Sequence, residues 1–368
     1  MWFKKNLAAY KHMSIGIRRV HMPTRSHATS IAENESSKPR ITELAKKAGV
    51  SPSTISKVIN GRTGVSDETR KKVEEVLLKS GREYSLVSTK ISPTIELLVD
   101  YVANNGTIEM ITYASRWAQR EGLALTVAQT DNGKKRDECL RGIVDRNPLG
   151  VIAQMSDLTQ KDKEFLRMRN IPLIIIDPVS LSNGEDHTIS IDNWTGAYEL
   201  TKHLINLGHK RIGVITGPLN VQSGVARFAG YNAAMEQSGL TIDKDLVKEG
   251  DYLPERGYEM ACKILDLPEE KRPTAIFACN DITAVNVYRA ARERGIKLGS
   301  ELSVAGFDDV YPAQYLMPSL TTVNQPFDSI AKNAIRMILE IREGKEIENQ
   351  LVLPAHIVIR ESTQTVVD

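Results

Sequence analysis

The segment ITELAKKAGVSPSTISKVINGRTG, residues 41–64, decides the fold of the N-terminal part of the chain. Its first apolar residues repeat at intervals of three and four and so predict one face of a helix: Ile41, Leu44, Ala45 and Ala48. Gly49 is expected to end this helix, because glycine readily adopts the left-handed conformation of a tight turn.

A second helix is expected after the turn, with Ser51 as its cap and Pro52 at its first position. A third helix is expected after Ser66, which caps it in the same way. The apolar residues of these helices would face a common interior: Ile55, Val58 and Ile59, then Val73, Val76 and Leu77. Three short helices with a glycine turn between the first two are typical of a helix-turn-helix DNA-binding head.

Residues 80–94 have the composition of a linker, and beyond them the pattern changes. Short apolar runs predict strands at 95–101, 123–128, 150–155, 172–177, 211–216, 274–279 and 302–307. Amphipathic stretches between them predict helices at 194–207, 227–237, 257–265 and 284–294. This alternation predicts parallel sheets wrapped by helices, and roughly ten strands favour two α/β lobes with a cleft between them. The β-rich end, residues 351–360, is expected to close the second lobe.

The charge of the chain is unevenly distributed along its 368 residues. Residues 1–40 carry eight Lys or Arg and two Asp or Glu, and residues 41–90 carry ten and six. The total of +2 is therefore the sum of +10 on the first 90 residues and −8 on the remaining 278 residues. A basic N-terminal part indicates nucleic acid as its partner.

Several classes of protein are excluded by the same sequence. It has no run of 18 apolar residues and no secretory signal pattern, so neither a membrane partner nor export is expected. Three widely spaced cysteines, Cys139, Cys262 and Cys279, are expected to be reduced, buried residues of a cytoplasmic protein. The sequence lacks the common catalytic and nucleotide-binding motifs. His209 is expected to be a surface residue. We therefore expect no enzyme activity, no cofactor and no metal.

The segment 41–64 closely resembles the DNA-binding head of the lactose-repressor/galactose-repressor family. Five further segments resemble the signatures of that family's effector domain, in family order: GHKRIGVITGP (208–218), RFAGY (227–231), FACND (277–281), LSVAGFDD (302–309) and LTTVNQP (320–326). The resemblance implies a two-lobed effector domain with the fold of periplasmic sugar-binding proteins, built on two parallel doubly wound sheets, and a homodimer. More weakly, IDP (176–178) and the stretch 192–196 resemble regulators of xylose or xylo-oligosaccharide use.

The expected domain organisation follows from these segments. It comprises a disordered extension (1–39), the head (40–80), a linker or hinge (81–94) and an effector and dimerisation domain (95–362). Lobe 1 is expected at about 95–190 and 324–343, and lobe 2 at about 191–323 and 344–362.

The recognition helix must present its N-terminal side chains to base edges in the major groove. The resemblance places Pro52 and Ser53 at the base-reading positions and Lys57 at the basic position after them, and Thr54 is also expected to be exposed. Lys57 replaces the usual Arg and so lacks its planar fork. Other polar side chains suit phosphate oxygens, although each serine there could simply cap a helix or face solvent: Thr42, Ser51, Ser56, Asn60 and Ser66. The linker lacks the Pro-Asn of the family's hinge, and Leu86 is its candidate for a minor-groove wedge.

A sugar-binding cleft needs carboxylates, an Arg or Asn and an aromatic plate. The resemblance places Arg227, Asp308 and Tyr252 in the cleft. Further candidates follow strands or could bind a hydroxyl: Asn280, Asp177, Asp192 and Ser223. Arg227 and Asp308 could instead form a plain interlobe salt bridge. Asp281 and Asp309 could cap helices, and Trp194 could be a cleft wall or a core residue.

These observations predict a cytoplasmic, homodimeric repressor of sugar-utilisation genes. A small sugar, with xylose or a xylo-oligosaccharide favoured, would release it from double-stranded operator DNA. Three alternatives remain open: a regulator that uses its ligand or a partner protein as co-repressor, a transport-type sugar-binding protein, and a sugar-processing enzyme.

Overall fold

The computed structural model describes residues 41–59, 64–80, 91–102, 105–131, 134–155, 158–178 and 186–366. The expected extension (1–39), most of the linker, Asn60 and Leu86 lie outside these residues. None of the helices in the described ranges is long and apolar enough to cross a membrane.

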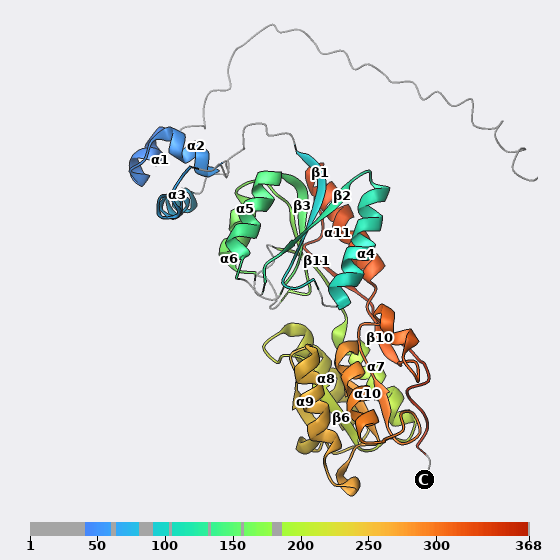
Figure 1. Cartoon of the computed structure of the whole chain (residues 1–368). Helices are drawn as coiled ribbons and strands as arrows, with labels where there is room; N and C mark the ends of the chain where they lie inside the picture. The colour runs from blue at the N-terminus through green and yellow to red at the C-terminus, as the bar shows by residue number, and fades with distance from the viewer. Residues whose placement is uncertain are drawn as a thin grey trace, which may run out of the picture. The chain divides into compact units, whose positions relative to one another are not determined.

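The head consists of α1 (Ile41–Ala48), α2 (Pro52–Ile59) and α3 (Asp67–Lys79) (Figure 1). Gly49 has a φ of 65°, so the expected left-handed turn between the first two helices is confirmed. The hydroxyl of Ser51 accepts a hydrogen bond from the backbone N–H of Thr54 at 3.1 Å, as expected of a cap. The interior of the head contains the expected apolar residues: Leu44, Ala45, Ala48, Ile55, Val58, Ile59, Val73 and Leu77.

Lobe 1 is built on a six-stranded sheet with the order β11-β5-β4-β3-β1-β2. Its strands are β1 (Ser92–Val99), β2 (Ala124–Gln129), β3 (Pro148–Gln154), β4 (Leu173–Ile176), β5 (His187–Ile191) and β11 (Gln350–Leu353). All neighbouring pairs are parallel. Both faces of such a sheet are covered, so its strands are apolar runs rather than alternating patterns.

Figure 1 shows the two helical layers of lobe 1 on either side of this sheet. One layer contains α4 (Asn105–Arg120) and α11 (Phe327–Arg342), and the other contains α5 (Arg136–Arg146) and α6 (Gln160–Arg167). Successive residues of β1 separate accordingly: Leu97 belongs to the core that includes Met110 and Ile338, and Leu98 to the core that includes Leu140 and Leu166.

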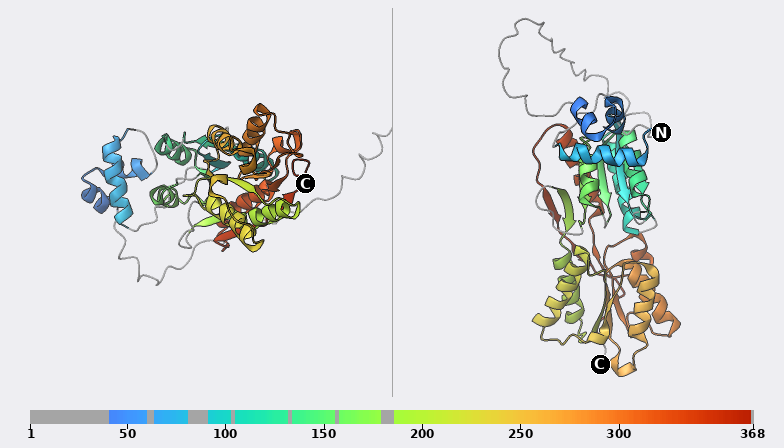
Figure 2. Two further views of the ribbon diagram at one scale, coloured as in Figure 1. Left: turned by 90° about the horizontal axis from the view of Figure 1, so that it is seen from below. Right: turned by 90° about the vertical axis from the view of Figure 1, so that its left-hand side faces the viewer.

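Lobe 2 is built on a four-stranded parallel sheet with the order β7-β6-β8-β9. Its strands are β6 (Ile212–Thr216), β7 (Val247–Glu249), β8 (Ala275–Ala278) and β9 (Ser303–Ala305). Figure 2 shows α7 (Asn193–Asn206) and α8 (Gln222–Gln237) on one face, and α9 (Pro254–Leu265) and α10 (Asp281–Glu293) on the other. The expected α/β class with two parallel sheets is confirmed.

One expectation about the C-terminal strands is wrong. The segment 351–360 does not close the second lobe as a unit, because β11 pairs with β5 and completes the sheet of lobe 1. After Pro354, β12 (His356–Val358) pairs antiparallel with β10 (Thr322–Asn324). Proline has no N–H to donate to a strand ladder, so the run is divided at this residue.

Candidate functional site

The recognition helix α2 has one buried face and one exposed face. Ile55, Val58 and Ile59 are buried. Pro52, Ser53, Ser56 and Lys57 are exposed, which is the distribution that base contacts require. Thr54 is half-buried, and its hydroxyl lies 2.9 Å from that of Ser51.

Two of the serines expected at phosphates also cap helices. Ser51 caps α2, and the hydroxyl of Ser66 accepts a hydrogen bond from the N–H of Thr69 at 3.3 Å at the start of α3. Both remain exposed, as does Thr42 on α1, so capping does not prevent contact with DNA. The contacts of these residues with DNA stay predictions.

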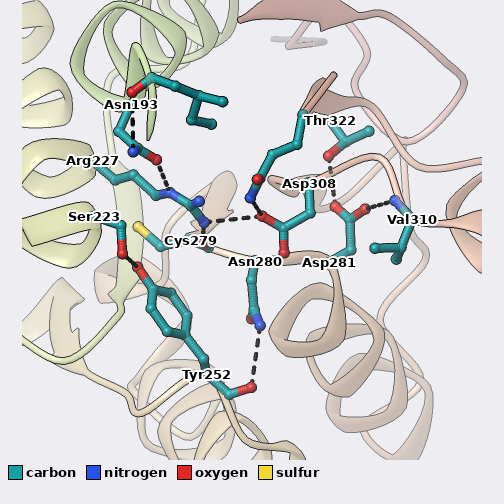
Figure 3. Close-up of polar contacts among 12 residues, drawn as sticks. Asn193, Ser223, Arg227, Tyr252, Cys279, Asn280, Asp281, Asp308, Val310 and Thr322 are labelled. Atoms are coloured by element: carbon teal, nitrogen blue, oxygen red, sulfur yellow. Dashed lines mark hydrogen bonds and ion pairs between the residues drawn. The ribbon is translucent and has the colours of Figure 1, made fainter. Parts of the chain in front are cut away.

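The centre of the effector site is Arg227 on α8, which is 3% exposed. Its Nε donates to Asn193 Oδ1 at 2.8 Å, and its Nη1 donates to the carbonyl of Cys279 at 2.6 Å and to Asp308 Oδ1 at 3.1 Å (Figure 3). The guanidinium lies 3.7 Å from the centre of the Phe307 ring. Burial alone lowers its pKa, but Tyr252, Asp308 and Asp177 raise the pKa above its usual value, so Arg227 stays cationic.

Asp308 faces Arg227 from the loop after β9. Its Oδ1 also accepts from Gln325 Nε2 at 2.6 Å. Within the described residues, neither Asp308 Oδ2 nor Arg227 Nη2 has a hydrogen-bond partner. Burial raises the pKa of Asp308, and Arg227 partly offsets this effect. The pair therefore offers a ligand one acceptor and one donor side by side.

Three other predicted residues line a cavity of about 230 Å³ next to this network: Asp177, Asp192 and Ser223. Asn193 belongs to both the cavity and the network. Burial raises the pKa of Asp177 to about 6, although the charge of Arg227 opposes the shift. Asp192 caps α7 through the N–H of Thr195 at 3.0 Å.

Tyr252 and Asn280 stand at the other side of the network (Figure 3). The hydroxyl groups of Tyr252 and Ser223 lie 3.4 Å apart, and burial raises the pKa of Tyr252 to about 12. Gly217 makes room for the ring, because a Cβ there would lie 2.0 Å from Tyr252. Asn280 caps α10 and donates to the carbonyl of Tyr252 at 3.2 Å, so both ends of its amide have partners in the protein.

Backbone strain is concentrated at this site. Four of the non-glycine residues with positive φ belong to it or adjoin it: Asp177 (46°), Tyr252 (66°), Asp308 (117°) and Asp309 (54°). Such conformations cost free energy and persist where the surrounding structure holds them, often at ligand-binding positions.

The structure decides several alternatives that the sequence left open. Asp281 is not the cap of α10, because Asn280 has that role. Asp281 instead accepts from Thr322 at 2.6 Å and from the N–H of Val310 at 2.9 Å (Figure 3). Asp309 is not a cap either, because it forms an ion pair with Arg360 at 2.7 Å.

The exposed fractions of two further residues, Trp194 and His209, decide their roles. Trp194 is a cleft wall and not a core residue, since it lines the 230 Å³ cavity and is 41% exposed. His209, expected at the surface, is 3% exposed, so that expectation is wrong. Its ring nitrogens lie 2.8 Å from the Thr274 hydroxyl and 3.0 Å from the Ser303 hydroxyl, and burial lowers its pKa.

Sequence reasoning missed two polar residues of the site, Asn193 and Gln325, and did not select Gln154 at the end of a neighbouring strand. Asn193 and Gln325 hold Arg227 and Asp308 as described above. Gln154 ends β3, and its Oε1 is buried without a hydrogen-bond partner in the described part of the chain. The rule that ligands bind at the carboxyl ends of parallel strands, which selected Asp177, also applies to Gln154.

The fold and the site define a DNA-binding regulator with a small-molecule domain, and comparison with known proteins agrees. Residues 40–81 match the bacterial regulatory proteins of the lacI family, and residues 201–363 match the periplasmic binding protein-like domain. The HTH-type transcriptional repressor PurR of Histophilus somni is 32% identical over 333 residues, which are 88% of this chain and 99% of the relative. PurR of Haemophilus influenzae is 31% identical over 336 residues, 89% and 99% of the two chains.

Solved structures show the same architecture. The complex of the transcriptional regulator CelR with cellobiose has a TM-score of 0.69 at 26% identity and covers 88% of this chain and 99% of CelR. The lac repressor dimer bound to operator and the anti-inducer ONPF has a TM-score of 0.66 at 23% identity, covering 89% and 99% of the two chains.

This chain belongs to the lacI family of bacterial regulatory proteins. It is a DNA-binding transcriptional repressor with a periplasmic-binding-protein-like effector domain, and not an enzyme.

Proposed function

We propose that the chain is a homodimeric repressor that a small sugar releases from its operator. The observation that carries this proposal is the pair formed by Arg227 Nη2 and Asp308 Oδ2, a donor and an acceptor without hydrogen-bond partners among the described residues, next to a cavity that shares Asn193 with this network. A sugar hydroxyl both donates and accepts a hydrogen bond, so it suits this pair. Charge-assisted bonds of this kind are roughly twice as strong as neutral ones.

The walls of the cavity favour a small saccharide. Asp177, Asp192 and Ser223 offer polar atoms, while Trp194 offers an apolar ring face. At about 230 Å³ the cavity is smaller than most drug-sized ligand pockets, which favours xylose over a xylo-oligosaccharide. The cellobiose complex of CelR supports a saccharide as the class of ligand.

Release follows from unequal affinity of the sugar for two arrangements of the lobes. Asp177 and Asp192 follow strands of lobe 1, whereas Arg227 and Asp308 belong to lobe 2. A sugar that contacts both sets would stabilise one arrangement, and it can shift the equilibrium only by its difference in affinity between the two.

We place the domain boundaries at 40–80 for the head, 81–91 for the linker and 92–366 for the effector domain.

A second copy of the chain would complete the regulator, because two recognition helices read a roughly palindromic operator. Large apolar side chains of lobe 2 are available for such an interface: Tyr311 is 65%, Tyr315 63% and Met317 91% exposed. Since operator DNA is the proposed site of action, we propose a cytoplasmic location.

The test combines a ligand screen with operator binding. Purified protein is screened by thermal shift against pentoses, hexoses, disaccharides and nucleobases, and each hit is added to the protein–operator complex in a fluorescence-anisotropy titration. We expect xylose to raise the melting temperature and to release the DNA. A ligand that tightens the complex would identify a co-repressor instead, and specific DNA binding in no ligand state would refute the proposal.

A further inference from the structure

Asp281 is a buried carboxylate whose position the fold alone does not explain. It is the first residue of α10 and is 1% exposed. A carboxylate in the interior of a lobe costs free energy unless hydrogen bonds stabilise it. Asn280 already caps α10, so capping is not the reason for an acidic residue here. The reason lies in the other contacts that Asp281 makes.

These contacts hold both sides of the turn that carries Asp308. The N–H of Asp281 donates to the carbonyl of Phe307 at 2.8 Å, just before the turn. The Oδ2 of Asp281 accepts from the N–H of Val310 at 2.9 Å, just after it (Figure 3). One residue therefore fixes the backbone on either side of Asp308 and Asp309.

The turn between these contacts is strained. Asp308 has a φ of 117° and Asp309 a φ of 54°. The first value lies outside even the small left-handed region open to residues other than glycine. Such a conformation persists where surrounding contacts hold it. It is the conformation in which Asp308 Oδ1 meets Arg227 Nη1 at 3.1 Å.

The surroundings of Asp281 suit a carboxylate. A Cβ at Gly306 would lie 2.2 Å from Asp281 Oδ1, so glycine leaves room for this oxygen. The partners of the carboxylate are both donors: the N–H of Val310 and the hydroxyl of Thr322, which lies 2.6 Å from Oδ1. A carboxylate offers an acceptor oxygen to each donor, whereas an amide has one acceptor oxygen.

The contact with Thr322 connects the turn to the segment that joins the lobes. Thr322 is fully buried and begins β10, and the chain continues from β10 into α11 of lobe 1. The same strand also bonds to the turn directly, since the N–H of Asp308 donates to the carbonyl of Val323 at 2.8 Å. A ligand that displaces Asp308 therefore acts on this segment.

We propose that Asp281 is a positioning residue of the effector site, which holds the turn at Asp308 and Asp309 in its strained conformation and connects this turn to β10. The inference rests on the proposed role of Asp308 in effector binding. Asp281 acts through Asp308: it keeps that carboxylate beside Arg227 and transmits its displacement to the interlobe segment.

Asp281→Ala tests whether this residue holds the turn. Hydrogen exchange of the peptide that contains Val310 is measured by mass spectrometry, and xylose affinity by calorimetry, both on the full chain. We expect faster exchange and about tenfold weaker xylose binding, because a buried N–H loses its acceptor. Asp281→Asn should recover most of the affinity, since its one acceptor oxygen can face Val310.

Tyr231→Phe is the matched control. It removes another buried hydrogen bond of lobe 2, from the Tyr231 hydroxyl to the carbonyl of Ile212 at 2.8 Å, at the first residue of β6. We expect this variant to lose stability but to keep the xylose affinity of the wild type. An equal loss of affinity in Tyr231→Phe and Asp281→Ala would mean that Asp281 only stabilises the lobe, and would overturn the proposal.

Thr322→Val tests the connection to β10 and leaves Asp281 in place. It should retain xylose affinity but reduce the release of operator DNA by saturating xylose about threefold, measured by anisotropy. Should Asp281→Ala fail to fold, this variant decides, and unchanged release would overturn the proposal. Wild-type exchange at Val310 in Asp281→Ala would overturn it as well. If xylose does not bind the wild type, the sugar proposal fails, and the exchange at Val310 still decides whether Asp281 holds the turn.

Discussion

Arg227 and Asp308 form a buried ion pair, and Arg227 Nη2 and Asp308 Oδ2 have no hydrogen-bond partner in the described part of the chain. Removing one partner of a buried pair leaves an uncompensated charge, which costs about 3–5 kcal/mol of stability. The cost is lower for a substitution that keeps shape and hydrogen-bonding capacity. The pair is therefore best tested with an isosteric variant that removes only the negative charge.

Asp308→Asn is expected to weaken effector binding by tenfold or more, because the charge-assisted acceptor beside Arg227 is lost. Operator affinity without effector should be unchanged. Calorimetry with the effector and anisotropy with operator DNA measure the two properties. Asp309→Asn is the matched control, since Asp309 pairs with Arg360, and an equal loss of effector affinity in this variant would contradict the assignment.

Asp177 titrates in an accessible pH range, since burial raises its pKa to about 6. The folded-state pKa lies above the ordinary value of 3.8, so the folded protein binds the proton more strongly than the unfolded chain does. The contribution of Asp177 to stability is therefore complete below pH 4 and is lost as the pH rises through 6. Asp177→Asn should raise stability at pH 7 by about 1–2 kcal/mol, measured by urea unfolding.

The same group is expected to make effector binding depend on pH. The ionised carboxylate accepts hydrogen bonds from ligand hydroxyls, so affinity in the wild type should fall as the pH decreases from 7 to 5. Calorimetry over this range should show the fall in the wild type and a flat profile in Asp177→Asn. A profile that is equally steep in both proteins would exclude Asp177 as its source.

Individual residues show which features of the site could be predicted from the sequence and which could not. Arg227 and Asp308 were predicted from short motifs around them, and the structure brings them together. His209 was placed wrongly, because its burial depends on Thr274, Ser303 and Gln364, which are 65 to 155 positions away in the sequence. No local pattern contains that information.

At the scale of elements, the helices of lobe 2 and the apolar strands follow from local patterns, whereas α4 and α11 of lobe 1 were not predicted. Each of the seven apolar runs overlaps a strand of the structure, and the glycine turn of the head was predicted at its residue. The strands that were not identified have three to five residues: β5, β7 and β10. Such strands bury too few side chains to show a period, and their pairing is decided by the rest of the sheet.

Gly49→Ala tests the turn on which the head depends. An added Cβ would find space, because its nearest neighbour is Lys72 Nζ at 3.7 Å, but a φ of +65° is unfavourable for alanine. The cost is about 1–2 kcal/mol. We expect a lower melting temperature for the head and unchanged effector binding, measured by calorimetry. Gly122→Ala in lobe 1, with a φ of +70°, should leave the head unaffected.

For the whole molecule, the uneven distribution of charge along the chain predicts how DNA affinity depends on salt. The basic residues of the head face a polyanion, whereas the effector domain is acidic and should not bind DNA alone. Operator affinity is therefore expected to fall steeply with salt. The slope counts the phosphates that are neutralised, so a single substitution can show whether a lysine contacts a phosphate or a base.

Lys57→Ala applies this distinction to the recognition helix, where Lys57 is exposed four residues after Ser53. A base contact is worth about 1–3 kcal/mol, so specific affinity should fall roughly 5- to 150-fold per head, with a smaller effect on random DNA. Lys79→Ala removes the same charge from the end of α3 and should weaken both alike. Anisotropy titrations at several salt concentrations measure the affinity of each variant for the operator and for random DNA. Equal losses for operator and random DNA in Lys57→Ala, with the salt slope reduced by about one per head, would assign Lys57 to a phosphate and leave base reading to Ser53.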